Sequence, residues 1–102
     1  MMKPLVSLID ALKRYRPQRV ILFGSAARGE ADAESDLDVL VIKETDEPFT
    51  DRLEAMANLC PPGVHADILV YTPEELQMML AEGNPFITLA LQEGKVIYEA
   101  RP

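Results

Sequence analysis

Three aspartates inside apolar runs are the residues of this sequence best suited to chemistry. Asp36 and Asp38 stand two apart in DLDVLVIK, residues 36–43, and Asp67 lies in HADILVY, residues 65–71. Side chains two apart in a β-strand leave the same face, so the carboxylates of Asp36 and Asp38 are expected about 7 Å apart. Like charges that close repel each other in a low dielectric. They stay ionised if a cation lies between them or if water reaches them freely.

A hard divalent cation is the natural occupant of such a pair. Mg²⁺ binds one or two carboxylates together with the phosphates of a substrate. If the strand with Asp67 neighbours the strand with the pair, the three carboxylates could hold two ions and place a base near an attacking hydroxyl. The residues alone leave two alternatives open: a solvated strand start for the pair, and a water-facing strand edge for Asp67.

A second feature precedes the acidic pair. The apolar run RVILF, residues 19–23, ends at Gly24-Ser25. A strand that ends in glycine and is followed at once by a helix presents backbone N–H groups and a hydroxyl to an anion. The alternative is a plain turn with Ser25 as a helix N-cap. Arg28 then faces either a phosphate or a neighbouring glutamate.

The elements that position these residues follow from hydrophobic periodicity and from breakers such as Pro61-Pro62-Gly63. The run Thr72-Pro73-Glu74-Glu75 has the residues of a capped helix start. We expect helices over residues 4–15, 26–30, 48–59, about 73–83 and 85–92, and strands over 19–23, 36–43, 65–71 and 95–99. The predicted fold class is α/β (α+β), with a mixed sheet of about four strands flanked by helices in one domain over residues 1–102.

Bulk properties narrow the function classes. The formal net charge of −7 over 102 residues argues against stable nucleic-acid binding and against anionic membranes. The single cysteine, Cys60, leaves no intrachain disulfide and is expected to be a buried hydrophobe near a helix end. The N-terminal apolar stretch is too short for a signal peptide or a membrane span, so we expect a cytoplasmic protein.

The ordered combination of these motifs resembles a known family. Gly24-Ser25, ten residues and then Asp36-x-Asp38, in GSAARGEADAESDLD, is similar to the signature of the minimal nucleotidyltransferases of the DNA polymerase beta superfamily. Arg28-Gly29 and Ser35-Asp36 match further positions that are frequent in that signature. The resemblance extends over essentially the whole chain, since the leading helix and the strand with the third acid follow in the family's order.

The resemblance implies a nucleotidyltransferase fold and the transfer of a nucleoside monophosphate, most simply AMP from ATP, with two Mg²⁺ ions once nucleotide is bound. Asp36, Asp38 and Asp67 would then be the catalytic, metal-holding carboxylates, with Asp67 base-like. Gly24, Ser25 and Arg28 would hold the nucleotide phosphates.

The resemblance also implies a partner. Small members of this family are often the antitoxin of a type VII-like toxin–antitoxin pair whose toxin is a HEPN-domain ribonuclease, and some adenylylate a tyrosine of that toxin. Because the chain ends at Pro102, we expect another molecule to supply the acceptor, and oligomers could form through that partner. The alternative is a non-catalytic subunit, with or without nucleotide, that neutralises the toxin by covering it. Both hypotheses predict a complex, but only the enzyme predicts a covalent mark.

Overall fold

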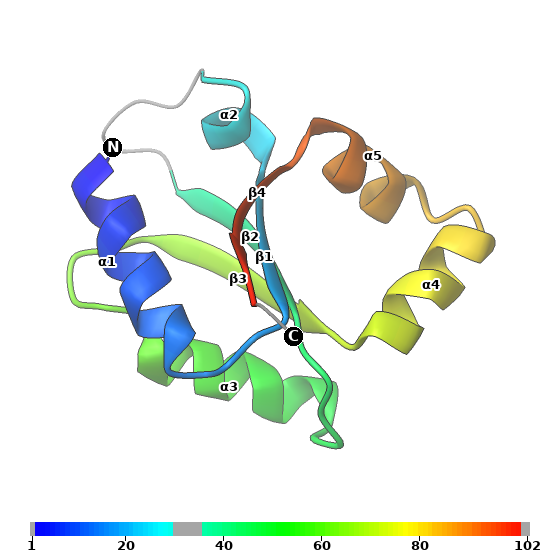
Figure 1. Cartoon of the computed structure of the whole chain (residues 1–102), viewed down its shortest axis with the longest axis horizontal. Helices are drawn as coiled ribbons and strands as arrows, with labels where there is room; N and C mark the ends of the chain where they lie inside the picture. Colours follow the sequence, from blue (N-terminus) through cyan, green and yellow to red (C-terminus); the bar gives the residue numbers. More distant parts are fainter. Residues whose placement is uncertain (1, 30–35, 101–102) are drawn as a thin grey trace.

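One mixed β-sheet with helices on both faces forms the framework (Figure 1). The structure, a computed structural model, describes residues 2–29 and 36–100. Within them, four strands lie in the order β3-β2-β1-β4, and β1 runs antiparallel to both of its neighbours while β2 and β3 are parallel. The strands are β1 (Arg19–Phe23), β2 (Leu37–Ile42), β3 (Ala66–Tyr71) and β4 (Lys95–Glu99). This sheet confirms the predicted fold class.

Apolar side chains cover both faces of the central strands. In β2, Leu37, Val39 and Val41 pack against α1 (Met2–Lys13) and α3 (Phe49–Leu59), while Leu40 and Ile42 pack toward α4 (Pro73–Ala81) and α5 (Pro85–Glu93). Figure 1 shows these two helix pairs on opposite sides of the sheet. Because both faces of β2 are buried, its register cannot slip without exposing apolar surface. Within the described ranges, no helix has the length and apolarity needed to cross a membrane.

The shortest helix differs from its prediction. The helix predicted over 26–30 is instead α2 (Gly24–Ala27), and Arg28 is its C-cap. Ser25 is therefore inside the first turn and the predicted serine N-cap is wrong, since Phe23 occupies that position without a side-chain capping bond. The reason is Gly24, whose φ of 71° turns the chain directly at the strand end. The predicted polar loop over 31–35 lies outside the described residues, and so does Ser35 of the signature.

The remaining boundaries follow the prediction closely. The strands β1 and β4 have the predicted bounds, and Asp36 lies immediately before β2 instead of inside it. The start of α4 is a capping box, in which Thr72 Oγ1 accepts from the backbone N–H of Glu75 and the Glu75 carboxylate accepts from the backbone N–H of Thr72. This arrangement confirms the helix start predicted from the local sequence.

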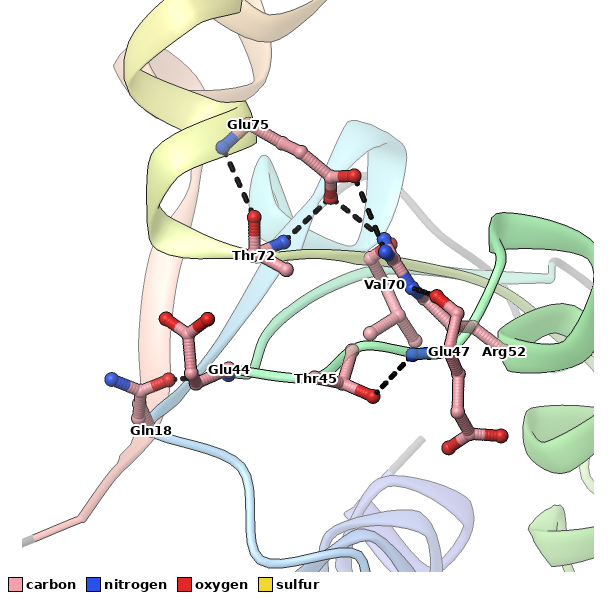
Figure 2. Close-up of polar contacts among 8 residues, drawn as sticks. All are labelled: Gln18, Glu44, Thr45, Glu47, Arg52, Val70, Thr72 and Glu75. Carbon is pink, nitrogen blue, oxygen red and sulfur yellow. Dashed lines mark hydrogen bonds and ion pairs between the residues drawn. The ribbon is translucent and has the colours of Figure 1, made fainter.

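A buried arginine joins the helices on the two sides of the sheet (Figure 2). Arg52 of α3 is only 5% exposed. Its guanidinium donates to Glu75 Oε1 at 2.7 Å and to Glu75 Oε2 at 3.2 Å, and also to the carbonyls of Val70 and Glu47. Since Glu75 also caps α4, one carboxylate connects α3, the edge strand β3 and the start of α4.

Replacing Glu75 tests this connection. The hydrogen bond from Arg52 is the main cause that holds the pKa of Glu75 below its ordinary value. Glu75→Gln should lower the free energy of unfolding by about 1 kcal/mol at pH 7, a modest figure because the Glu75 side chain is 41% exposed. Because the pKa of Glu75 is lower in the folded than in the unfolded state, its carboxylate stabilises the fold at pH values above the unfolded-state pKa. The difference in free energy of unfolding between wild type and Glu75→Gln should therefore shrink below about pH 4.5. Urea unfolding from pH 7 to pH 3 measures it, with exposed Glu54→Gln as control. A difference that stays constant over this range would contradict the assignment.

Candidate active site

Two of the predicted acids lie side by side on the sheet. Asp38 of β2 and Asp67 of β3 are directly paired in the parallel register, so their side chains leave the same face of the sheet. The partner of Asp38 on the other side is Phe23, the last residue of β1. The alternation of β2 places Asp38 on the face of Leu40 and Ile42, which is the face that α5 covers. The sheet thus brings the ends of three strands together around Asp38.

The surroundings of Asp38 raise its pKa above the ordinary value. Burial raises its pKa, and the negative charges of Asp67 and then Asp36 raise it further, while the positive charge of Arg28 lowers it. Asp38 is half-buried, whereas Asp36 and Asp67 are exposed. The other three predicted charged site residues therefore act on the carboxylate of Asp38, and a bound cation would relieve the repulsion among the three acids.

Gly24 packs directly against Asp38. A Cβ atom at position 24 would overlap Asp38 Oδ2 and would lie 3.1 Å from its Cγ. Any other residue at position 24 would place a side chain against Asp38 and would be strained at this positive φ. Gly24 therefore lets the backbone at the start of α2 approach the carboxylate. The first N–H groups of a helix have no partner within it, and the hydroxyl of Ser25 stands in the same turn. Gly24 and Ser25, two of the predicted phosphate-binding residues, therefore stand at the turn that packs against Asp38, one of the three predicted metal-binding residues.

Arg28 follows in the turn after α2. Its Nη1 lies 3.0 Å from Glu93 Oε2 in the last turn of α5, so the glutamate that the sequence analysis anticipated as one alternative is present. Its positive charge also lowers the pKa of Asp38. Arg28 thus connects α2 and α5 next to the carboxylates.

A pocket of about 420 Å³ opens beside Asp38 and Asp67. Its lining is otherwise apolar and comes from both faces of β3, from the end of β1, from α3 and from α5: Phe23, Leu53, Met56, Ala57, Cys60, Ala66, Ile68, Leu69 and Phe86. The rings of Phe23 and Phe86 meet edge to face, with centroids 5.6 Å apart. The pocket is concave and apolar with two polar groups, which is the usual form of a small-molecule or side-chain site.

Cys60, which lines the pocket, and His65, which directly precedes the lining residue Ala66, take part in hydrogen bonds with the backbone. Cys60 is half-buried at the C-cap of α3, where its thiol donates to the carbonyl of Val64 at 3.3 Å. Burial raises the pKa of that thiol, so it stays protonated near neutral pH. His65 is exposed just before β3, and its carbonyl accepts from the backbone N–H of Leu37.

The donor set suits magnesium only together with a substrate. Across residues 2–29 and 36–100, no three His, Cys, Asp or Glu side chains come close enough to hold a metal ion by themselves. The carboxylates of Asp38 and its neighbours are nevertheless the hard oxygen donors that Mg²⁺ prefers, and Mg²⁺ usually completes its shell with phosphate and water oxygens. The site fits an ion that arrives with a nucleotide.

The aromatic wall of the site, formed by Phe23 and Phe86, was not predicted from the sequence. Phe23 stands directly before Gly24 and two residues after Ile21, so strand alternation alone places it on the face of the acids. The place of Phe86 could not be predicted, because nothing local shows that α5 returns to the end of β1. The contributions of α3 likewise depend on the order of the strands, which periodicity does not determine.

The sheet, the glycine turn and the paired acids define a nucleotidyltransferase. The chain belongs to the polymerase beta nucleotidyltransferase family, whose model matches residues 7–102. The predicted enzyme class is thereby confirmed.

Individual relatives agree with this family. A Methanocaldococcus jannaschii protein described as a "putative protein adenylyltransferase" is 32% identical over 99 residues, which cover 94% of this chain and 96% of that protein. A solved structure of a Sulfolobus solfataricus "putative nucleotidyltransferase" has a TM-score of 0.60 at 18% identity, covering 97% of this chain and 80% of that one. A solved toxin–antitoxin structure with AMP-PNP has a TM-score of 0.58 at 17% identity, covering 93% and 73%. The two structures show that the fold is shared.

The contact between Gly24 and Asp38 can be tested by a double-mutant cycle. Gly63 also has a positive φ but has open space around its missing side chain, so Gly63→Ala reports backbone strain alone, about 1 kcal/mol. Gly24→Ala should cost about 1–3 kcal/mol more, because its methyl group meets the Asp38 carboxylate. In an Asp38→Ala background the additional cost should largely disappear. Chemical denaturation of wild type, the two single variants and the double variant measures the coupling, with Gly63→Ala as the separate control. An equal loss of unfolding free energy for Gly24→Ala in both backgrounds would refute the contact.

Proposed function

We propose that this protein transfers AMP from ATP to a tyrosine hydroxyl of a HEPN-domain toxin, in a Mg²⁺-dependent reaction, and thereby acts as the antitoxin of a type VII-like pair. The observation that carries the proposal is the direct pairing of Asp38 with Asp67 beside the Gly24 turn. A relative described as a protein adenylyltransferase supports a protein acceptor. A toxin–antitoxin neighbour with AMP-PNP supports an adenine nucleotide and a toxin partner.

The nucleotide would be held by two sets of residues. Asp36 and Asp38, with Asp67 beside them, would hold Mg²⁺, which when bound neutralises phosphate charge and polarises the phosphorus–oxygen bonds. Gly24 and Ser25 would hold the β- and γ-phosphates through backbone N–H groups and the Ser25 hydroxyl. Arg28, whose guanidinium pairs with Glu93, would exchange part of that pairing for a phosphate oxygen.

The proposed chemistry is an in-line displacement. The tyrosine oxygen attacks the α-phosphorus of ATP, an oxygen–phosphorus bond forms, and the bond from that phosphorus to the bridging oxygen of the β-phosphate breaks. Pyrophosphate leaves with the bonding electron pair. The hydroxyl proton passes to the carboxylate of Asp67, which is exposed and so accessible to an incoming acceptor.

The acidity of the chain favours a protein acceptor over RNA. With a formal net charge of −7, the chain would repel a nucleic-acid backbone and attract a basic protein surface. We place the reaction in the cytoplasm, since it consumes ATP and the chain carries a single cysteine. Higher oligomers would form through the partner.

Mass spectrometry of the intact partner tests the function. The protein encoded beside this chain is incubated with this chain, Mg²⁺ and ATP, and its mass should rise in steps of one AMP unit. The Asp36→Ala/Asp38→Ala variant should add no mass, and omission of Mg²⁺ should also prevent the addition. Gel filtration of the same mixtures reports whether the complex forms.

The outcomes separate the enzyme from a covering subunit. A stable complex without added mass under any of the four common ribonucleoside triphosphates would contradict the transferase and favour neutralisation by binding. Added mass with the double variant would contradict the assignment of the aspartates. Added mass on a residue other than tyrosine would refute only the proposed acceptor.

A further inference from the structure

The order of the strands sets a direction across the site. Gly24 and Ser25 follow β1, Asp38 lies on the adjacent strand β2, and Asp67 lies on the edge strand β3. If the nucleotide phosphates lie at Gly24 and Ser25, as the proposed function has it, the leaving pyrophosphate lies on the β1 side of Asp38. The present inference rests on that function.

An in-line displacement then dictates where the acceptor enters. The attacking and leaving oxygens occupy opposite sides of the phosphorus, and the ribose and its base occupy neither of these two positions. The acceptor oxygen must therefore approach from the β3 side. Asp67 lies on that side and is paired directly with Asp38, so its carboxylate can receive the proton of an oxygen that arrives there.

The pocket described above extends to this side: its lining runs from Phe23 at the end of β1 to both faces of the edge strand β3. It contains the carboxylates of Asp38 and Asp67, and the rest of its lining carries neither lysine, arginine nor histidine. An anionic group such as a polyphosphate would meet two negative charges and no positive one. A neutral ring would meet apolar walls from α3 and β3, and Phe86, which is 46% exposed at the rim, offers a face or edge for aromatic contact.

We propose that this pocket binds the aromatic ring of the acceptor side chain and holds its phenolic hydroxyl against Asp67. Its volume of about 420 Å³ exceeds that of one aromatic ring and leaves space for the flanking backbone of the acceptor. The pocket thus selects tyrosine over serine or threonine. A short aliphatic side chain would leave the apolar walls, which include Ala57 of α3 and Phe86 of α5, in contact with water.

Methyl NMR with a small probe tests the assignment. Met56 lines the pocket and Met78 lies exposed on α4 away from its lining, so their ¹³C-labelled methyl signals serve as reporter and control. N-acetyl-L-tyrosinamide should shift the Met56 signal saturably and leave Met78 unchanged, and N-acetyl-L-serinamide should shift neither. The absence of a saturable Met56 shift would overturn the proposal.

A pair of variants on α3 distinguishes the acceptor from the nucleotide base. Ala57 is exposed and lines the pocket, whereas the adjacent Asn58 is exposed and does not. Ala57→Phe should weaken binding of the tyrosine probe at least about tenfold, and Asn58→Phe should leave it unchanged. Both variants should bind Mg²⁺–AMP-PNP like the wild type. Loss of AMP-PNP affinity in Ala57→Phe alone, or competition between AMP-PNP and the probe, would assign the pocket to the base and overturn the proposal.

The two proposals fail separately. Saturable probe binding with the expected variant pattern, together with no AMP transfer to the partner, would contradict the proposed function and leave the ring pocket supported. Transfer to the partner that proceeds equally well with Ala57→Phe would contradict the pocket and leave the function supported.

Discussion

Two carboxylates that face each other across a parallel ladder are the constraint around which this fold is organised. Asp38 and Asp67 are paired residue to residue, and the burial of Asp38 together with its acidic neighbours raises the pKa of Asp38. An apolar core would avoid this arrangement, because like charges in a low dielectric destabilise the folded state. The apolar residues of both faces of β2 nevertheless hold the register in which the two acids meet. The packing of the core thus holds two like charges on neighbouring strands.

Residues of the elements around Asp38 and Asp67 accommodate the two carboxylates. Gly24 lacks the side chain that would collide with Asp38 and is also the first residue of α2, so the backbone at the strand end comes close to the Asp38 carboxylate. Arg28 pairs with Glu93 of α5 and partly offsets the negative charge of Asp38. Arg52 and Glu75 tie α3 to α4 across β3 and hold the edge strand that carries Asp67. The site is therefore asymmetric: Gly24, Ser25 and Arg28 follow β1, whereas the apolar pocket extends from Phe23 to both faces of β3.

Local chemistry explains which parts could be predicted from the sequence. The β-branched run RVILF and the capping box at Thr72 depend on neighbouring residues, and the structure confirms both. The predicted N-cap role of Ser25 is wrong because the positive φ of Gly24 starts the helix at residue 24, two residues before the predicted start. The ion pair of Arg52 and the contact of Phe86 with Phe23 join distant segments, so they follow from the strand order and not from periodicity. The acids themselves were found because apolar runs make charged residues conspicuous.

If Asp36 and Asp38 hold the magnesium that accompanies a nucleotide, calorimetric titration with AMP-PNP should show it. Wild type should bind AMP-PNP at least about tenfold more tightly with Mg²⁺ than without it. The Asp36→Ala/Asp38→Ala variant should lose this magnesium-dependent gain while its thermal stability stays equal or rises, because like charges have been removed. Unchanged Mg²⁺–AMP-PNP affinity in a folded double variant would contradict the account.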